Sequence, residues 1–398
     1  MTNQKRNGAA ASKEDGPLPL LAWTELDIGR VVGRGGFSVV SEVQGIKLNE
    51  VYDTSDEDAR VRRQFAETCT LDNPHNSYVI KVLRTDLSEE EHTKGIVDLA
   101  VEANFLETIS HPNIITMRAM ANSDPYENRF FVILDLLTMT LERKMNFWRR
   151  QVNENAGVWM GPCCGYCCSN KPALYHLWME RIAVSRDIAN AIYYLHTNDI
   201  VYRDLKPDNV GFNSEGQVKI FDFGLAKRLD PMDKTDDGLY RMTGNTGSLR
   251  YMAPEVADCL PYDLRVDAYS FGILFWQICS LTTPYAGFST KMHAEKVLRQ
   301  GYRPKPDSTW PLTWTELMET CWSSDVPSRP NFDYIVRVLN EQVDQMTQEE
   351  GVVPSRASDI RAKKKRHKAK RGESRLDLDT RLASGEDVSV KRFDVNVI

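Results

Sequence analysis

Short runs in which apolar residues alternate or follow one another mark the first part of the chain, and this is the pattern of β-strands. They cover residues 26–32, 38–43, 78–83 and 130–137. Between the last two, Ser88-Glu89-Glu90-Glu91 has the pattern of a helix capping box. The helix it predicts continues with apolar residues at helical spacing: Ile96, Leu99, Ala103, Leu106 and Ile109.

Helical periods dominate the second part of the chain. One helix face carries Trp178, Ile182, Ser185, Ala189, Ile192 and Leu195. Further helical segments are predicted at about 265–282, 290–300, 311–322 and 331–346. Strands followed by helices predict an α+β protein of two lobes.

Several polar segments interrupt this pattern and divide the chain. Residues 1–22 have the composition of a disordered tail, and residues 347–398 form a polar C-terminal tail. The domain predicted between them, residues 23–346, carries two inserts at about 47–77 and 149–172. The first insert is rich in acidic residues and has no convincing strand, so we expect a surface loop.

Composition and charge limit the classes of protein to which the chain can belong. The 398 residues have a formal net charge of −6, which gives no reason to expect a nucleic-acid partner. We expect no transmembrane segment, because no run of about 18 apolar residues occurs. The N-terminus lacks the apolar core of a secretory signal, so the eight cysteines are expected to be reduced thiols of a soluble, intracellular, cytoplasmic protein.

Two polar motifs carry the candidate chemistry. They are Tyr202-Arg203-Asp204-Leu205-Lys206-Pro207-Asp208-Asn209 and, after a short strand, Asp222-Phe223-Gly224. In order and spacing they resemble the catalytic loop and the metal-binding triplet of the eukaryotic protein kinases. The resemblance implies that Asp204 orients the acceptor hydroxyl and accepts its proton, and that Lys206 neutralises charge on the transferred phosphate. Asn209 and Asp222 would bind Mg²⁺.

Two positions depart from the family pattern. Tyr202 stands where these kinases usually carry histidine, and we expect it to serve as a packing post beneath Phe223. Ser38 stands where a third glycine is usual in the loop that covers the ATP phosphates. The nucleotide-binding residues implied there are Gly33, Gly35, Gly36, Ser38 and Val40.

Other matches complete the implied ATP site. Lys81 corresponds to the strand lysine that contacts the α and β phosphates, and Glu102, nine positions before His111, to the helix glutamate that holds it. The apolar run at 131–137 resembles the hinge strand. The adenine of ATP would there bind the backbone at Asp135 and Leu137, after a gatekeeper at Leu134.

The downstream motifs agree with this resemblance and refine it. Glu255 of Ala253-Pro254-Glu255 should pair with Arg329, and Asp267 should brace the catalytic loop. Lys206, Gly247-Ser248 and the late Cys-Trp and Arg-Pro signature resemble the serine/threonine type, in the tyrosine-kinase-like group near the Raf-like and mixed-lineage kinases. The implied function is transfer of the ATP γ-phosphoryl group to serine or threonine of protein substrates; a pseudokinase scaffold, an allosteric partner and a dual-specificity kinase stay open.

The same resemblance implies control by phosphorylation. Arg203 precedes Asp204. Kinases with this arginine leave its charge uncompensated until a phosphate arrives on the activation segment, the stretch that Ala253-Pro254-Glu255 closes. Lys227 is expected to face the same pocket. Thr243 or Thr246 is the preferred acceptor, modified by an upstream kinase or by self-phosphorylation, while Ser248 is expected to bond Asp204 and Lys206.

Two further motifs remain open. Cys163-Cys164-Gly165-Tyr166-Cys167-Cys168 has the spacing of half a zinc site, but it also fits palmitoylation or ordinary surface thiols. The basic block at 361–371 fits nuclear import, an anionic surface or a solvated tail.

Overall fold

The computed structural model describes residues 17–69, 77–127, 129–155 and 171–352. The chain divides into two compact units, residues 1–343 and 344–398. All strands and helices named below lie in the first unit, except that helix α9 (Phe332–Val352) ends in the second.

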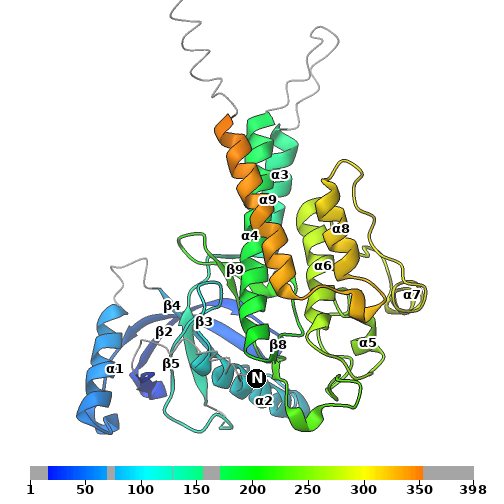
Figure 1. Ribbon diagram of the computed structural model, residues 1–398. Helices are drawn as coiled ribbons and strands as arrows, with labels where there is room; N and C mark the ends of the chain where they lie inside the picture. The colour runs from blue at the N-terminus through cyan, green and yellow to red at the C-terminus, as the bar shows by residue number, and fades with distance from the viewer. Residues whose placement is uncertain (1–16, 70–76, 128, 156–170, 353–398) are drawn as a thin grey trace, which may run out of the picture. The chain divides into compact units, whose positions relative to one another are not determined.

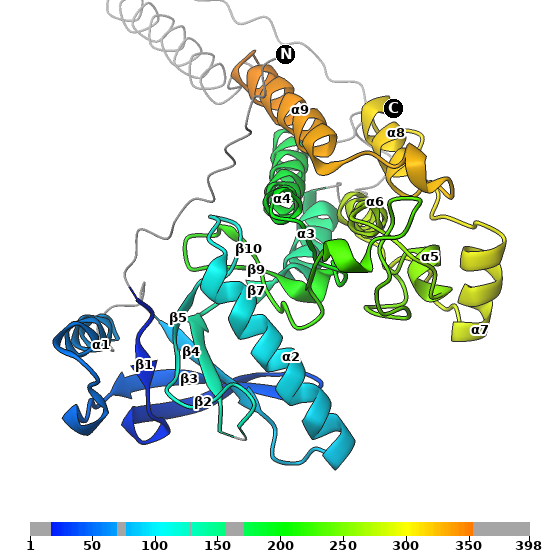
Figure 2. The same ribbon diagram turned by 60° about the horizontal axis from the view of Figure 1, so that its bottom comes forward.

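A six-stranded sheet forms the first lobe, in the spatial order β1-β5-β6-β4-β3-β2 (Figures 1 and 2). All neighbouring strands are antiparallel except β1 and β5, which are parallel. The strands are β1 (Leu20–Leu21), β2 (Leu26–Arg34), β3 (Ser38–Ile46), β4 (Tyr78–Leu83), β5 (Met117–Ala121) and β6 (Phe131–Asp135). Four of these strands are those that the apolar runs predict.

Helix α2 (Glu89–Thr108) packs on β4 and β5. The predicted capping box is present: the Glu91 amide donates to Ser88 Oγ, and the Ser88 amide donates to Glu91 Oε2 at 3.0 Å. A Cβ at Gly95 would lie 2.9 Å from both Leu83 Cδ2 and Phe37 Cβ. Glycine at this position therefore lets the helix approach the tip of the β2–β3 hairpin.

Helices build the second lobe around α6 (Arg265–Ser280), which is almost wholly buried and packs against α4 and α8. The others are α3 (Leu141–Asn155), α4 (Lys171–Thr197), α5 (Pro254–Ala257), α7 (Thr290–His293), which continues as a π turn over Ala294–Arg299, and α8 (Leu312–Cys321). Small sheets join β7 (Met139–Thr140), β9 (Val210–Phe212) and β10 (Val218–Ile220), and β8 (Ile200–Val201) with β11 (Lys227–Arg228). The predicted α+β architecture of two lobes is confirmed.

The loop predicted for the first insert is wrong, because residues Asp56–Thr68 form helix α1. Ser55 caps it by accepting a hydrogen bond from the Asp58 amide. The buried face carries Ala59, Arg62 and Phe65 at three-residue spacing, with a guanidinium at its centre instead of an apolar group. Arg62 is fully buried and forms ion pairs with Glu25 and Asp53.

The predicted start of the domain and the predicted second insert also shift. Residues 17–22 belong to the lobe and not to a disordered tail, since β1 pairs with β5 and Leu21 is fully buried. The second insert is shorter than predicted, because α3 extends to Asn155 and α4 begins at Lys171. The cysteine motif at 163–168, the basic block at 361–371 and residues 1–16 lie outside the described residues.

No helix within the described ranges has both the length and the apolar character to cross a membrane.

We predict that Arg62→Ala lowers the free energy of unfolding by about 3–5 kcal/mol, because it leaves the buried Glu25 carboxylate without its partner. The side chains of Arg62 and Glu25 are 0% and 1% exposed. Arg63→Ala, at the neighbouring exposed position, should change it by less than about 0.5 kcal/mol. Urea denaturation of both variants measures this. Equal effects of the two substitutions would contradict the role given to the buried pair.

Candidate active site

The backbone of the catalytic loop is held by one buried carboxylate. Asp267, at the start of α6, accepts hydrogen bonds from the amides of Tyr202 and Arg203, each at 2.8 Å. Its Oδ2 also lies 2.8 Å from His196 Nε2 at the end of α4. Arg203 has a left-handed φ of 69°, which costs free energy for a non-glycine residue. The predicted bracing role of Asp267 is confirmed, and it stabilises a strained turn.

Asp204, next in the chain, is the centre of a dense polar cluster. Its Oδ2 accepts from Lys206 Nζ at 2.6 Å and from Asn209 Nδ2 at 2.9 Å, and its Oδ1 accepts from the Ser248 amide at 2.9 Å. Lys206 Nζ also donates to Ser248 Oγ at 3.0 Å, as the sequence predicts. The activation segment and the catalytic loop thus meet at one carboxylate.

Tyr202 fills the position that usually holds histidine. Its ring is fully buried and contacts the Phe223 ring edge-on, with centroids 5.3 Å apart. Burial raises its pKa well above 10, so the hydroxyl stays neutral and donates to the Phe221 carbonyl at 2.5 Å. The expected packing post is therefore present, with an added tie to the backbone beside Asp222.

Lys81 joins the two lobes. From β4, its Nζ contacts Glu102 Oε2 of α2 at 2.5 Å and Asp222 Oδ1 at 3.2 Å. Burial lowers the pKa of Lys81, but the carboxylates of Glu102 and Asp222 outweigh burial and the pKa is raised. The ammonium is therefore charged at neutral pH, and the structure brings together the three residues that the sequence assigns to the phosphate site.

The glycine-rich residues form the tip of the β2–β3 hairpin. The Gly35 amide donates to the Ser38 carbonyl at 2.8 Å, and Gly33 lies opposite Val40 in the strand register. Val40 in turn lies opposite Lys81 on β4. The strand register therefore places Val40, which is implied to bind the nucleotide, beside Lys81, which is expected to contact the phosphates.

The hinge follows strand β6. Leu134 is buried and the Asp135 carboxylate forms an ion pair with Arg118, with Oδ1 2.7 Å from Nε. The amides of Leu136 and Thr138 donate to the carbonyls of Ser77 and Phe212, at 2.9 and 2.8 Å. These bonds fix the backbone on both sides of Leu137.

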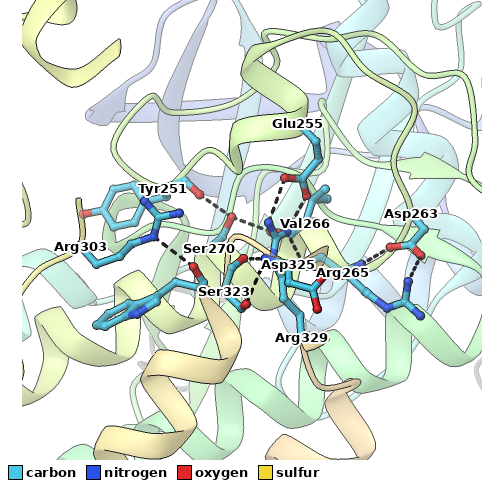
Figure 3. Close-up of polar contacts among 11 residues, drawn as sticks. Tyr251, Glu255, Asp263, Arg265, Val266, Ser270, Arg303, Ser323, Asp325 and Arg329 are labelled. Atoms are coloured by element: carbon cyan, nitrogen blue, oxygen red, sulfur yellow. Dashed lines mark hydrogen bonds and ion pairs between the residues drawn. The ribbon is translucent and has the colours of Figure 1, made fainter. Parts of the chain in front are cut away.

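The predicted ion pair at the end of the activation segment is confirmed (Figure 3). Arg329 contacts both carboxylate oxygens of Glu255, at 2.5 and 3.0 Å, and donates to the Ser323 carbonyl at 2.9 Å. Nearby, Ser270 Oγ of α6 donates to the Tyr251 carbonyl at 2.7 Å. Sequence reasoning missed Ser270, although a polar residue within an apolar helix could have indicated it.

Comparison with known families decides the identity of this arrangement. The model of the protein tyrosine and serine/threonine kinase family matches residues 27–339. The chain belongs to this family.

Similar curated proteins support membership of the same family. This chain is 38% identical to the serine/threonine-protein kinase STY17 of Arabidopsis thaliana over 170 residues, which are 42% of this chain and 28% of that protein. It is 33% identical to the serine/threonine/tyrosine-protein kinase HT1 of the same plant over 287 residues, 72% of this chain and 65% of HT1. The chain thus spans less than two thirds of the length of these relatives.

The activation segment of this kinase is held by Arg203. Its guanidinium donates to the Leu225 carbonyl at 2.6 Å, to Thr243 Oγ1 at 2.9 Å and to the Tyr262 hydroxyl at 3.1 Å. Lys227 does not join it as expected, because its Nζ pairs with Asp233 Oδ2 at 2.8 Å. Of the two cations predicted to face the phosphate, Arg203 therefore reaches the predicted phosphorylation site Thr243, and Lys227 does not.

Asp98 is a neighbour of the site that sequence reasoning missed. It lies one turn before Glu102 on α2, and a Cβ at Gly224 would be 3.1 Å from the Asp98 Cβ. Burial, with a further contribution from the charge of Asp222, raises the pKa of Asp98 to about 6, against the opposing charges of Lys94 and Lys81. The spacing of four residues from Glu102 was the available signal.

We predict that Asp98→Asn stabilises the kinase by an amount that depends on pH. A carboxyl whose pKa is raised by folding costs stability once it is charged, so the gain should grow from about pH 4 to about pH 6 and then level off. Thermal denaturation of the nucleotide-free protein across this range, with the exposed Asp236→Asn as control, measures it. A gain that does not vary with pH would contradict the assignment.

Proposed function

We propose that this chain is an ATP-dependent protein kinase that phosphorylates serine and threonine. The observation that carries the proposal is the simultaneous presence of two assembled units: the Lys81–Glu102 ion pair reaching Asp222, and the Asp204–Lys206–Ser248 cluster. A protein kinase needs both for transfer.

The nucleotide is proposed to bind between the hairpin and the hinge. Backbone amides of Gly33, Gly35, Gly36 and Ser38 would approach the phosphates, with Val40 against the adenine. Lys81 would contact the α and β phosphates. The fixed backbone around Leu137 supports the proposed bonds from adenine to Asp135 and Leu137.

Asn209 and Asp222 fit a Mg²⁺ site. Both offer hard oxygen ligands, which this ion prefers. The Phe221 amide donates to the Asn209 carbonyl at 3.0 Å, which brings Asp222 next to Asn209. The Asn209 amide nitrogen is engaged by Asp204, so its side-chain oxygen is left for a cation. Bound there, the ion would neutralise phosphate charge.

Asp204 is proposed to act on the substrate. It would orient the acceptor hydroxyl and take its proton, while Lys206, held against it at 2.6 Å, would stabilise the charge on the transferred group. The Ser248 hydroxyl bound to Lys206 favours the serine/threonine type. The relative HT1 is named a serine/threonine/tyrosine-protein kinase, so dual specificity is the second candidate.

Wider assignments belong to the same proposal. We infer a kinase domain that includes residues 17–22 as well as the predicted residues 23–346, a cytoplasmic protein, and an upstream kinase or self-phosphorylation as activator. The four described cysteines that carry free thiols, Cys69, Cys259, Cys279 and Cys321, are consistent with a reducing compartment.

We predict that Asp204→Asn lowers the rate of phosphoryl transfer from ATP to myelin basic protein at least about 100-fold, because the amide cannot accept the proton. The protein should keep its ATP affinity and its cooperative thermal transition. Lys81→Met should also abolish transfer while the fold is kept. Asp236→Asn, an exposed carboxylate in the activation segment, is the matched control. Activity of Asp204→Asn within tenfold of the parent would reject the assignment.

We predict that phosphorylation of Thr243 or Thr246 activates the kinase. Arg203 already bonds the Thr243 hydroxyl at 2.9 Å, and a phosphate there would exchange a neutral hydrogen bond for charge-assisted ones. Phosphatase treatment, and the double variant Thr243→Ala/Thr246→Ala, should each lower activity at least about tenfold; mass spectrometry follows the phosphate. Full activity in both tests would mean that the segment needs no phosphate.

A further inference from the structure

A cavity of about 530 Å³ opens beside Lys206 and Ser248. Its walls come from α3, the catalytic loop, the segment 248–251 and the start of α7. Because it adjoins the residues assigned to the acceptor hydroxyl, a side chain of the substrate near that hydroxyl can enter it.

His293 is an unsatisfied group in the wall of this cavity. It is 2% exposed, and neither ring nitrogen has a hydrogen-bond partner within the described part of the chain. Burial and the charges of Arg250 and Arg303 lower its pKa, so the imidazole is neutral at pH 7 and offers one N–H donor. A buried donor without a protein partner is available to a group that enters the cavity.

Arg250 is a second residue of the cavity wall. It is exposed and lies near enough to His293 to lower the pKa of the imidazole. Across the described ranges, no carboxylate lies within ion-pair distance of Arg250. The part of the wall formed by Arg250 and His293 is here called the cationic end, and the charge of its guanidinium has no ion-pair partner.

The cavity wall also carries acidic side chains. Glu142 of α3 and Asp208 of the catalytic loop line the cavity, and both contribute, after burial, to raising the pKa of the Tyr251 hydroxyl, which lines it too. An anion entering the cavity is thus attracted by Arg250 and repelled by Glu142 and Asp208.

We propose that the cationic end, Arg250 and His293, is a subsite for an anionic side chain next to the acceptor serine or threonine of the protein substrate. This rests on the proposed kinase function. The imidazole N–H and the guanidinium would both donate to the anion, and charge-assisted bonds in a cavity are strong. A carboxylate and a phosphate present the same chemistry, and the test separates them.

The test uses peptides that share one sequence and differ at a single position near the acceptor. That position carries glutamate, phosphoserine or glutamine, and the series is repeated with the varied position moved stepwise along both sides of the acceptor. The kcat/KM of each is measured. At one position the anionic peptide should exceed the glutamine peptide about tenfold or more. A preference for phosphoserine over glutamate identifies a phosphate subsite, and the reverse a carboxylate subsite.

Substitutions in the cavity wall test whether the preference for an anionic peptide arises there. Arg250→Ala should bring the ratio of anionic to neutral peptide close to one, and Arg250→Glu should invert it. His293→Phe, which keeps an aromatic ring but removes both nitrogens, should lower the ratio. Arg299→Ala, an exposed arginine that pairs with Glu295, is the matched control and should keep it. An unchanged ratio in Arg250→Ala, or no preference at any position, would overturn the proposal.

Binding separates this inference from the proposed function. The same peptides with alanine at the acceptor are measured by fluorescence anisotropy, which needs no turnover. Tighter binding of the anionic peptide that depends on Arg250 supports the subsite even where no phosphate is transferred, an outcome that would overturn the kinase activity alone. Equal binding of the anionic and the neutral peptide would overturn the proposed subsite, whatever the rate of phosphoryl transfer.

Discussion

The buried carboxylate of Asp267 is the interaction on which the catalytic centre depends. It binds the amides of Tyr202 and Arg203 and the ring of His196. These bonds hold Arg203 at a positive φ, a conformation that costs an L-residue on the order of 1 kcal/mol or more. The turn directs Asp204 toward Lys206 and Ser248 and the Arg203 side chain toward Thr243. The Asp204 carboxylate and the Arg203 guanidinium are therefore oriented by the same three bonds.

The lobes are coupled by charge in a way that supports this centre. Lys81 lies between Glu102 of α2 and Asp222 of the other lobe, so its charge is compensated from both sides. Glycine at position 95 lets α2 lie close to Leu83 and Phe37, which ties the helix to the hairpin tip. A displacement of α2 would separate Glu102 from Lys81 and leave buried charge unpaired, which is costly. The ion pair thus links the hairpin, through α2, to Asp222 of the other lobe.

Sequence reasoning succeeded where a local motif determines the position of a residue and failed where the partner is distant. Asp204, Asn209 and Asp222 lie in short motifs, and the Glu255–Arg329 pair joins two motifs that each have a fixed place in the family. Helix α1 escaped detection because its central buried residue is Arg62, whose partner Glu25 lies 37 residues earlier. Lys227 was predicted from its place in a motif to face the same pocket as Arg203. Its ammonium instead pairs with Asp233, six residues later.

Helix α6 contacts both the catalytic loop and the wall of the cavity beside Lys206 and Ser248. Asp267, Ser270 and Gln277 lie on one side of this helix, since their spacings of three and seven residues return to similar angles. Asp267 holds the catalytic loop, Ser270 binds the Tyr251 carbonyl at 2.7 Å, and Gln277 Oε1 accepts from the Tyr251 hydroxyl at 2.5 Å. Tyr251 lines the cavity beside Lys206 and Ser248. One buried helix thus fixes both the catalytic loop that carries Asp204 and the Tyr251 side chain in the cavity wall.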